Sequence, residues 1–314
     1  MEINTYHNYK LLVVGGTGFI GRHIVKKSLD LGFNTTSLSK NNPIEQKKIK
    51  GVNYLIADIT DKQSLFSNLD GKVFDYVINS SGYINHSNYI NDGNKIFDAH
   101  FNGVKNLIDC LNNDKIKKFV QFGSSDEYGN NLAPQNENQK ESPIAMYSCA
   151  KVAATYFLQT LYKTQNFPSV ILRPFLVYGP KQGKNRFIPQ IIKGCINDEK
   201  FSTSKGMQIR DFLFIDDFVD AVFIALKNKK VLGETINVSS GIPVSIKKVI
   251  NTIVDTLKSG KPQFGKVKYR EGENMILYGD ISKIKSLLNW KPKVSLETGI
   301  RKTIESIKKN SCNE

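Results

Sequence analysis

A glycine-rich segment directly follows the first strand-like run of this chain and constrains its fold more than any other feature. The apolar run Leu11–Val14 leads into Gly-Gly-Thr-Gly-Phe-Ile-Gly, which opens a segment of helical periodicity. Glycines at this place let the backbone approach a pyrophosphate, and the helix N-terminus offers free N–H groups to the anion. A tight turn with close helix packing is the structural alternative. We predict that a dinucleotide binds at Gly15, Gly18, Phe19, Ile20 and Gly21.

Short β-branched runs alternate with helix-period segments through the first half of the chain. Strands are predicted at Leu11–Val14, Asn34–Leu38, Asn53–Ile56, Tyr76–Asn79, Lys117–Phe122 and Ser169–Leu172. Helices are predicted at Phe19–Leu31, Gly93–Leu111, Ala145–Lys163 and Phe187–Cys195. This alternation is typical of parallel strands joined by crossover helices. The predicted fold class is α/β, a Rossmann-type doubly wound parallel sheet of seven units with a smaller mixed α/β substrate-binding lobe.

Regular alternation weakens after Pro180, where a Gly/Lys-rich loop begins. We therefore predict an NAD(P)-binding Rossmann domain over residues 1–180 and a nucleotide-sugar-binding lobe over residues 181–314. Some later segments are expected to return to the first domain.

The ends of the second and third strands bear on the choice of cofactor. NAD enzymes usually place a carboxylate after the second strand to bind the adenosine ribose, whereas this chain has Ser39 and Lys40. A hydroxyl beside a cation suits a 2′-phosphate, so NADP is favoured over NAD, with Lys40 as its phosphate partner; a plain loop lysine is the alternative. Asp58 and Ile59 follow the third strand and are expected at the adenine edge, although Asp58 could equally belong to the cap of the next helix.

Tyr147 and Lys151 lie four residues apart in a predicted helix, which places a phenol and an ammonium on one face. A nearby cation favours the phenolate and brings tyrosine toward acid–base work at neutral pH. A surface pair is the alternative, but the spacing occurs about 130 residues after a dinucleotide loop. Ser125, just after the preceding strand, is positioned to hydrogen-bond a reacting oxygen. The predicted catalytic residues are Tyr147, Lys151 and Ser125.

Composition excludes several other classes of protein. The formal charge is +15, but the lysines are scattered in pairs without a basic stripe, so we expect no nucleic acid as a partner. No apolar run approaches the roughly 18 residues that a membrane span needs, so we expect no membrane partner either. The four cysteines contain no CxxC and the four histidines no ligand spacing, so neither a disulfide framework nor a metal site is predicted. The expected location is cytoplasmic.

These motifs together resemble the extended short-chain dehydrogenase/reductases, the NAD-dependent epimerase/dehydratase group that acts on nucleotide sugars. The resemblance covers nearly the whole chain. Beyond the loop and the catalytic residues, it includes Asn102, Arg173-Pro174, Val177–Pro180, Gln208–Phe212, Ile215–Asp217, Arg270–Glu273, Asp280–Lys283 and Leu288–Pro292. It implies an NAD(P)-dependent enzyme for a nucleotide-diphosphate sugar and a homodimer. A dinucleotide-sensing scaffold without catalysis is the alternative from another class.

The resemblance also implies substrate contacts. Arginines suit a diphosphate because they provide charge-assisted donors, although surface or structural ion pairs are the alternative. The implied substrate-binding residues are Ser125, Asp126, Glu127, Arg186, Arg210 and Arg270.

Two stretches of sequence bear on which reaction the chain catalyses. Residues 183–220 resemble reductases that convert CDP-4-keto-6-deoxyhexoses to paratose or abequose, so a 4-keto reductase is favoured. A 4-epimerase uses the same three catalytic residues and is the first alternative. A 4,6-dehydratase is the second, since Asp126 and Glu127 resemble its acidic pair, but Tyr128 follows Glu127 one residue too early.

Overall fold

The computed structural model describes residues 6–83, 89–269 and 272–311. The chain divides into two compact units that interleave along the sequence. The first unit comprises residues 1–129, 140–173 and 219–236, and the second comprises residues 130–139, 174–218 and 237–314. The predicted division into an NAD(P)-binding domain over residues 1–180 and a nucleotide-sugar-binding lobe over residues 181–314 stays a prediction.

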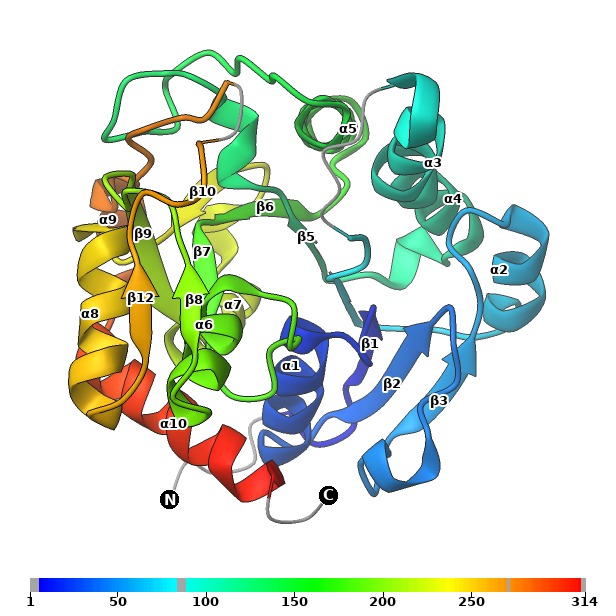
Figure 1. Cartoon of the computed structure of the whole chain (residues 1–314). Helices are drawn as coiled ribbons and strands as arrows, with labels where there is room; N and C mark the ends of the chain where they lie inside the picture. Colours follow the sequence, from blue (N-terminus) through cyan, green and yellow to red (C-terminus); the bar gives the residue numbers. More distant parts are fainter. Residues whose placement is uncertain (1–5, 84–88, 270–271, 312–314) are drawn as a thin grey trace. The chain divides into compact units, whose positions relative to one another are not determined.

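A seven-stranded sheet forms the centre of the first unit, in the order β10-β6-β5-β4-β1-β2-β3 (Figure 1). The strands are β1 Lys10–Val14, β2 Asn34–Ser39, β3 Asn53–Ile56, β4 Tyr76–Asn79, β5 Lys118–Phe122, β6 Ser169–Pro174 and β10 Thr235–Val238. Strands β1 to β6 pair in parallel, and Val14 at the end of β1 lies opposite Leu38 and Asn79. The predicted Rossmann-type sheet is confirmed, and its carboxyl edge carries the glycine-rich segment.

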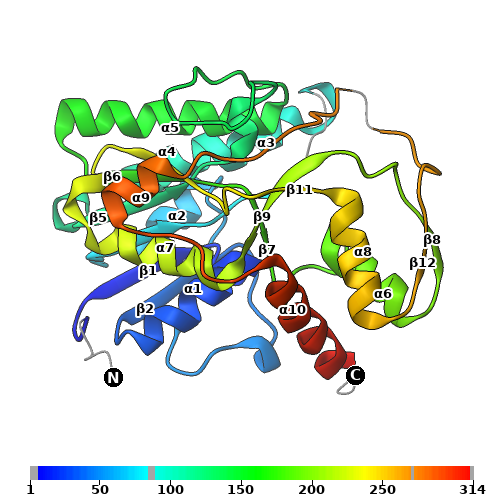
Figure 2. The same ribbon diagram turned by 90° about the vertical axis from the view of Figure 1, so that its left-hand side faces the viewer.

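Helices cover both faces of this sheet. Figure 2 shows α3, α4 and α5 on one face and α1 and α7 on the other. The helices are α1 Phe19–Asp30, α2 Lys62–Leu69, α3 Asn94–Phe97, α4 Gly103–Cys110, α5 Met146–Gln165 and α7 Ile215–Lys227. Shorter 3₁₀ turns are η1 Glu45–Lys47, η4 Asn113–Lys115, η5 Ser125–Tyr128 and η6 Lys229–Val231. Leu12, Val77 and Phe119 are fully buried and pack with α4 and α5 residues in one hydrophobic cluster, which holds the strand ends in fixed positions.

The long helix predicted from Gly93 differs from the structure. The described helical backbone includes Tyr89, four residues before Gly93, and contains two π-helical segments, η2 Tyr89–Gly93 and η3 Asp98–Asn102, on either side of α3. A π turn contains more residues than an α turn, so it changes which side chains share a face, and such turns are frequent at functional sites. Periodicity in the sequence did not reveal this change.

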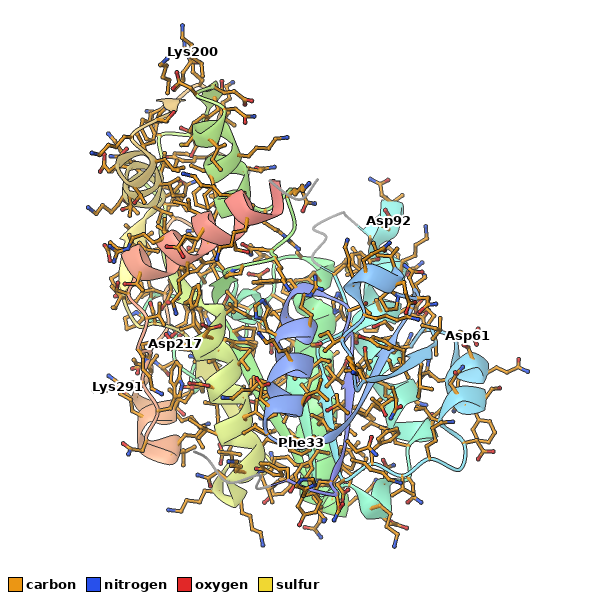
Figure 3. All side chains as sticks on the ribbon, turned by 90° about the horizontal axis from the view of Figure 1, so that it is seen from below. Phe33, Asp61, Asp92, Lys200, Asp217 and Lys291 are labelled. Atoms are coloured by element: carbon orange, nitrogen blue, oxygen red, sulfur yellow. The ribbon has the colours of Figure 1, made fainter. Side chains whose placement is uncertain are left out.

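Aromatic side chains close the opposite, amino-terminal edge of the sheet. Figure 3 labels Phe33, which follows α1, and its ring stacks on Tyr6 with 4.1 Å between ring centroids. Tyr76 meets Phe33 edge-on, and Lys117 Nζ lies 4.1 Å from the centre of the Tyr9 ring. These contacts stabilise the amino-terminal edge of the sheet. The glycine-rich turn lies at the opposite, carboxyl edge.

The second unit contains a small mixed sheet, as predicted. Its strand order is β11-β9-β7, in which β7 pairs with β9 in parallel and β11 pairs with β9 antiparallel. A separate pair joins β8 and β12. The elements are β7 Leu176–Tyr178, α6 Phe187–Ile196, β8 Lys200–Ser202, β9 Ile209–Phe214, β11 Pro243–Ser245, α8 Ile246–Leu257, β12 Lys261–Gln263, α9 Ser282–Leu288 and α10 Leu296–Ser311. In the described parts of the chain, no helix has the length and apolar character to span a membrane.

Candidate active site

The glycine-rich segment forms a tight turn from β1 into α1. Gly15 has φ +77°, and a Cβ there would lie 2.9 Å from the backbone of Ser80. A Cβ on Gly21 would lie 2.1 Å from the carbonyl oxygen of Gly15. Only glycine fits at either place. Part of the motif therefore serves a tight turn and close packing of the helix against the strand.

The same turn also presents the features that a pyrophosphate needs. Gly18 has extended backbone and precedes α1 without a side-chain cap, and the N–H groups of Phe19, Ile20 and Gly21 follow it. N–H groups in the first turn of a helix have no intrahelical acceptor, so they remain available to an anion at the positive end of the dipole. The cradle fits a dinucleotide, whose nicotinamide would provide hydride chemistry.

The predicted adenosine contacts at the ends of β2 and β3 are partly engaged with one another. Ser39 is buried, and its Oγ accepts a hydrogen bond from the Thr17 N–H at 3.3 Å. Lys40 Nζ lies 2.7 Å from Asp58 Oδ2. Partial burial opposes ionisation of Asp58, but the hydrogen bond from Lys40 still lowers the pKa of Asp58 below its ordinary value. The predicted phosphate partner is therefore already paired with a carboxylate.

Asp58 and the residues that follow it shape the turn before α2. Asp61, labelled in Figure 3, caps α2 by accepting the Ser64 N–H at 3.0 Å. Asp58 accepts the N–H and hydroxyl of Thr60 and so shapes the turn before that cap. The side chain of Ile59 belongs to the hydrophobic core. Only the backbone of Ile59 is suited to the predicted cofactor contact.

The turn after β5 holds Ser125 in place. Ser124 Oγ accepts the Asp126 N–H at 3.1 Å, and Glu127 Oε1 accepts the Ser124 N–H at 2.8 Å. Ser125 itself is buried. These reciprocal bonds form a capping box, which fixes the backbone that carries the Ser125 hydroxyl.

Glu127 occupies a different environment from the one predicted for a substrate contact. Its side chain is fully buried, and Oε2 accepts from Arg173 Nη2 at 2.7 Å and Nε at 3.0 Å, and from Thr155 Oγ1 at 2.9 Å. Arg173 also pairs with Glu141. Removing one partner of such a buried pair typically costs about 3–5 kcal/mol. These bonds favour a role for Glu127 in positioning the turn, and the substrate contacts expected for Glu127 and for the partly exposed Asp126 stay predictions.

Tyr147 and Lys151 lie in the first two turns of α5, beside the end of β5. Lys151 is buried, and its ammonium donates to the carbonyl oxygen of Phe122 at 2.7 Å. The Nζ atom lies 5.9 Å from the centre of the Tyr147 ring. Burial lowers the pKa of Lys151 to about 8, although the charge of Glu127 opposes the shift. A buried ammonium is therefore held next to a buried phenol, which is suited to proton transfer in a dry site.

His100 is a member of this site that the sequence analysis missed. It lies in the π-helical segment η3, and its ring meets the Tyr147 ring edge-on with 4.8 Å between centroids. Its Nε2 lies 2.8 Å from the carbonyl oxygen of Tyr83, which accepts, so Nε2 carries the proton. Burial first, and then the charge of Lys151, lower the pKa of His100 to about 3. Asn102 lies in the same segment, and its side-chain amide donates to Asp98 Oδ1.

The predicted substrate arginines belong to the second unit. Arg210, on β9, donates to the Ile209 carbonyl oxygen at 2.8 Å and forms an ion pair with Glu273. Arg186 immediately precedes α6 and is exposed. Arg270 lies outside the described residues. Among the described residues, no three His, Cys, Asp or Glu side chains gather as a metal site would require.

A Rossmann sheet with a glycine cradle and a buried Tyr/Lys pair defines a nicotinamide-dependent oxidoreductase of the short-chain dehydrogenase type. Residues 11–239 match the NAD dependent epimerase/dehydratase family. The chain belongs to this family, whose members are NAD-dependent enzymes that modify nucleotide sugars.

Two relatives and one solved structure illustrate similarity over nearly the whole chain. A putative UDP-glucose 4-epimerase of Methanocaldococcus jannaschii is 31% identical, with 96% of this chain and 99% of that protein covered. A dTDP-D-glucose 4,6-dehydratase of Mus musculus is 26% identical, with 97% and 90% covered. The crystal structure of UDP-glucuronic acid 4-epimerase from Bacillus cereus with UDP-glucuronic acid and NAD has a TM-score of 0.83 at 26% identity, with 96% and 99% covered.

Proposed function

We propose that this chain transfers hydride at C4 of a nucleotide-diphosphate sugar and that its net reaction is reduction of a 4-keto-6-deoxyhexose. The observation that carries the proposal is the buried ammonium of Lys151, bound to the Phe122 carbonyl beside the Tyr147 ring. A nicotinamide dinucleotide in the glycine cradle would supply the hydride. The protein's own groups would manage the proton and the developing charge on the sugar oxygen.

Each catalytic residue has a distinct role in this proposal. Tyr147 gives its hydroxyl proton to the sugar O4 as the carbonyl becomes an alcohol. Lys151 stabilises the negative charge that the proton leaves on Tyr147, and Ser125 donates a hydrogen bond to the same O4. Proton transfer by one positioned group typically contributes about 10²–10⁴-fold in rate. Asp126 and the arginines Arg186, Arg210 and Arg270 are proposed contacts for the sugar and its diphosphate.

Net reduction fits the end of β2. Ser39 and Lys40 offer no carboxylate to a ribose 2′-hydroxyl, which favours NADP(H). A reductase consumes one reduced cofactor per turnover, whereas an epimerase or a dehydratase regenerates its own.

A 4-epimerase is the second candidate, favoured by the 31% identical relative, which carries that name. The same Tyr147, Lys151 and Ser125 would serve both directions of hydride transfer. A 4,6-dehydratase requires acidic groups that reach the sugar, and Glu127 has its carboxylate bonded to Arg173 and Thr155. We therefore place dehydration last.

Cofactor stoichiometry tests the proposal. The purified protein is mixed with a CDP- or dTDP-4-keto-6-deoxyhexose and NADPH, and the reduced nicotinamide absorbance is followed beside the sugar product. Loss of one NADPH per alcohol formed supports a reductase. Tightly bound NAD with an inverted C4 in an NDP-hexose and no net oxidation would replace it with an epimerase.

A further inference from the structure

A cavity of about 210 Å³ lies beside the glycine cradle in the first unit. Its lining residues come from the cradle, the start of α1, the segment after β2 and strand β3. They are Gly16, Thr17, Arg22, Pro43, Ile44, Lys47, Ile49 and Tyr54. Pockets for whole ligands typically measure roughly 300–1,000 Å³, so this cavity suits one branch of a larger ligand. We call it the Arg22–Lys47 pocket.

Positive charge dominates this lining. Arg22 and Lys47 contribute two cations, and no lining residue is a carboxylate. Within the described parts of the chain, neither cation forms a salt bridge. Lys40, by contrast, is held 2.7 Å from Asp58. An incoming anion would therefore meet uncompensated charge at Arg22 and Lys47 and an existing ion pair at Lys40.

The rest of the pocket is apolar and held in shape by the backbone. The Tyr54 hydroxyl accepts the Ile49 N–H at 2.9 Å and so ties the segment after β2 to β3. Pro43 and Ile44 add an apolar wall, and Thr17 N–H binds Ser39 at the end of β2. A fixed, partly apolar recess with two cations is suited to a sugar phosphate rather than to a free inorganic ion.

We propose that the Arg22–Lys47 pocket binds the 2′-phosphate of NADP(H) and makes this chain prefer NADP(H) over NAD(H). This inference rests on the proposed function, since it assumes a dinucleotide in the adjacent cradle. The guanidinium of Arg22 presents planar paired donors to the phosphate oxygens, and Lys47 adds a second charge. The specificity residue is then not Lys40, the cation next to the end of β2.

Cofactor binding measured without turnover tests the pocket. Titration calorimetry gives Kd values for NADPH and NADH with the wild-type chain, Arg22→Gln, Lys47→Gln and the double variant. We expect each single substitution to weaken NADPH binding by about tenfold and the double substitution by about 100-fold, because each removes a charge-assisted hydrogen bond to the phosphate. The Kd for NADH should change by less than about twofold, since NADH has no 2′-phosphate.

Two further variants serve as controls. Lys26→Gln removes a charge from the same helix one turn beyond Arg22, outside the pocket lining, and should leave the NADPH/NADH ratio unchanged. Lys40→Gln tests the rival partner, and a collapse of the ratio in this variant alone would overturn the assignment. Adenosine 2′-monophosphate should compete with NADPH in the wild type and lose affinity in the double variant.

Failure of the pocket and failure of the proposed function give different results. Tight binding of both cofactors, with a ratio that the double variant leaves unchanged, would overturn only the pocket. A wild-type chain that binds neither NADPH nor NADH would overturn the proposed function as well.

Discussion

The two ends of strand β5 each hold a buried lysine, in contrasting environments. Lys118 opens the strand, and Lys151 reaches the carbonyl of Phe122 at its close. Both side chains are buried, and burial lowers the pKa of each to about 8. A perturbed pKa alone therefore does not identify a catalytic group, because structural sites perturb pKa values too.

Hydrogen-bond partners separate the two lysines. Lys118 donates to the carbonyl oxygens of Ala225, at 2.9 Å, and Asn228, at the carboxyl end of α7. A cation there satisfies carbonyls that lack intrahelical donors and interacts favourably with the helix dipole. Among the described residues, Lys151 has a single acceptor, Phe122, and two of its N–H donors remain for a ligand. The comparison predicts that Lys118 supports folding and that Lys151 supports catalysis.

The largest effect is expected at Tyr147. Tyr147→Phe keeps the ring that packs against His100 and removes only the hydroxyl. We expect kcat to fall by about 10³-fold, within the usual range for a positioned proton donor. Stopped-flow or steady-state assays with the 4-keto sugar measure kcat. The matched control is Tyr156→Phe, at an exposed tyrosine of the same helix. Activity within a few-fold of wild type would exclude Tyr147 as the acid.

The two lysines give the next prediction. Lys151→Met should lower kcat by roughly 10²–10³-fold, the cost of removing a preorganised charge, and leave the free energy of unfolding equal or higher. Lys118→Met should lower the free energy of unfolding by about 1–3 kcal/mol, because charged hydrogen bonds are lost, with kcat within about twofold. Denaturant titration and kinetics on both variants decide the matter. Equal losses of activity would erase the distinction.

Sequence reasoning recovered the features that local pattern determines. The bounds of β3 and β4 were predicted without error, since each is a short run flanked by turn residues. The placement of Tyr147 and Lys151 on one helix followed from their spacing, and their catalytic roles stay predictions. The features it missed depend on distant residues: Glu127 is buried because Arg173, 46 positions later, reaches it. Lys40 is paired because Asp58 follows the neighbouring strand β3.

Alkaline pH should separate the two lysines further. With a pKa near 8, the Lys151 ammonium is mostly lost by pH 10, so kcat/KM should fall about 100-fold between pH 7 and pH 10. The free energy of unfolding should change in the opposite direction. A lysine pKa lowered from 10.5 means that the unfolded chain binds more protons between pH 8 and 10.5, so the contribution of Lys151 to stability rises over that window. An activity profile that stays flat to pH 10 in the wild type would contradict the role of the ammonium.

Acid pH gives the smallest effect and tests His100, the histidine packed on Tyr147. The pKa of His100 is about 3 in the folded chain, against an ordinary value of 6.5. As the pH falls below 6.5, the unfolded chain therefore binds a proton at this histidine that the folded chain does not bind. Between pH 7.5 and 5.5 this linkage should remove about 1.4 kcal/mol from the free energy of unfolding.

His100→Phe should abolish that share of the pH dependence, whereas His7→Asn, at an exposed histidine, should retain it. Denaturant titrations of the three proteins at both pH values measure the difference. The kcat of His100→Phe should show no new titration near pH 6.5, because His100 is already neutral there and serves as an uncharged neighbour of Lys151. A wild-type acid limb near pH 6.5 that this substitution removes would instead make His100 a titrating partner in catalysis, and the end of β5 would then hold two ionising groups rather than one.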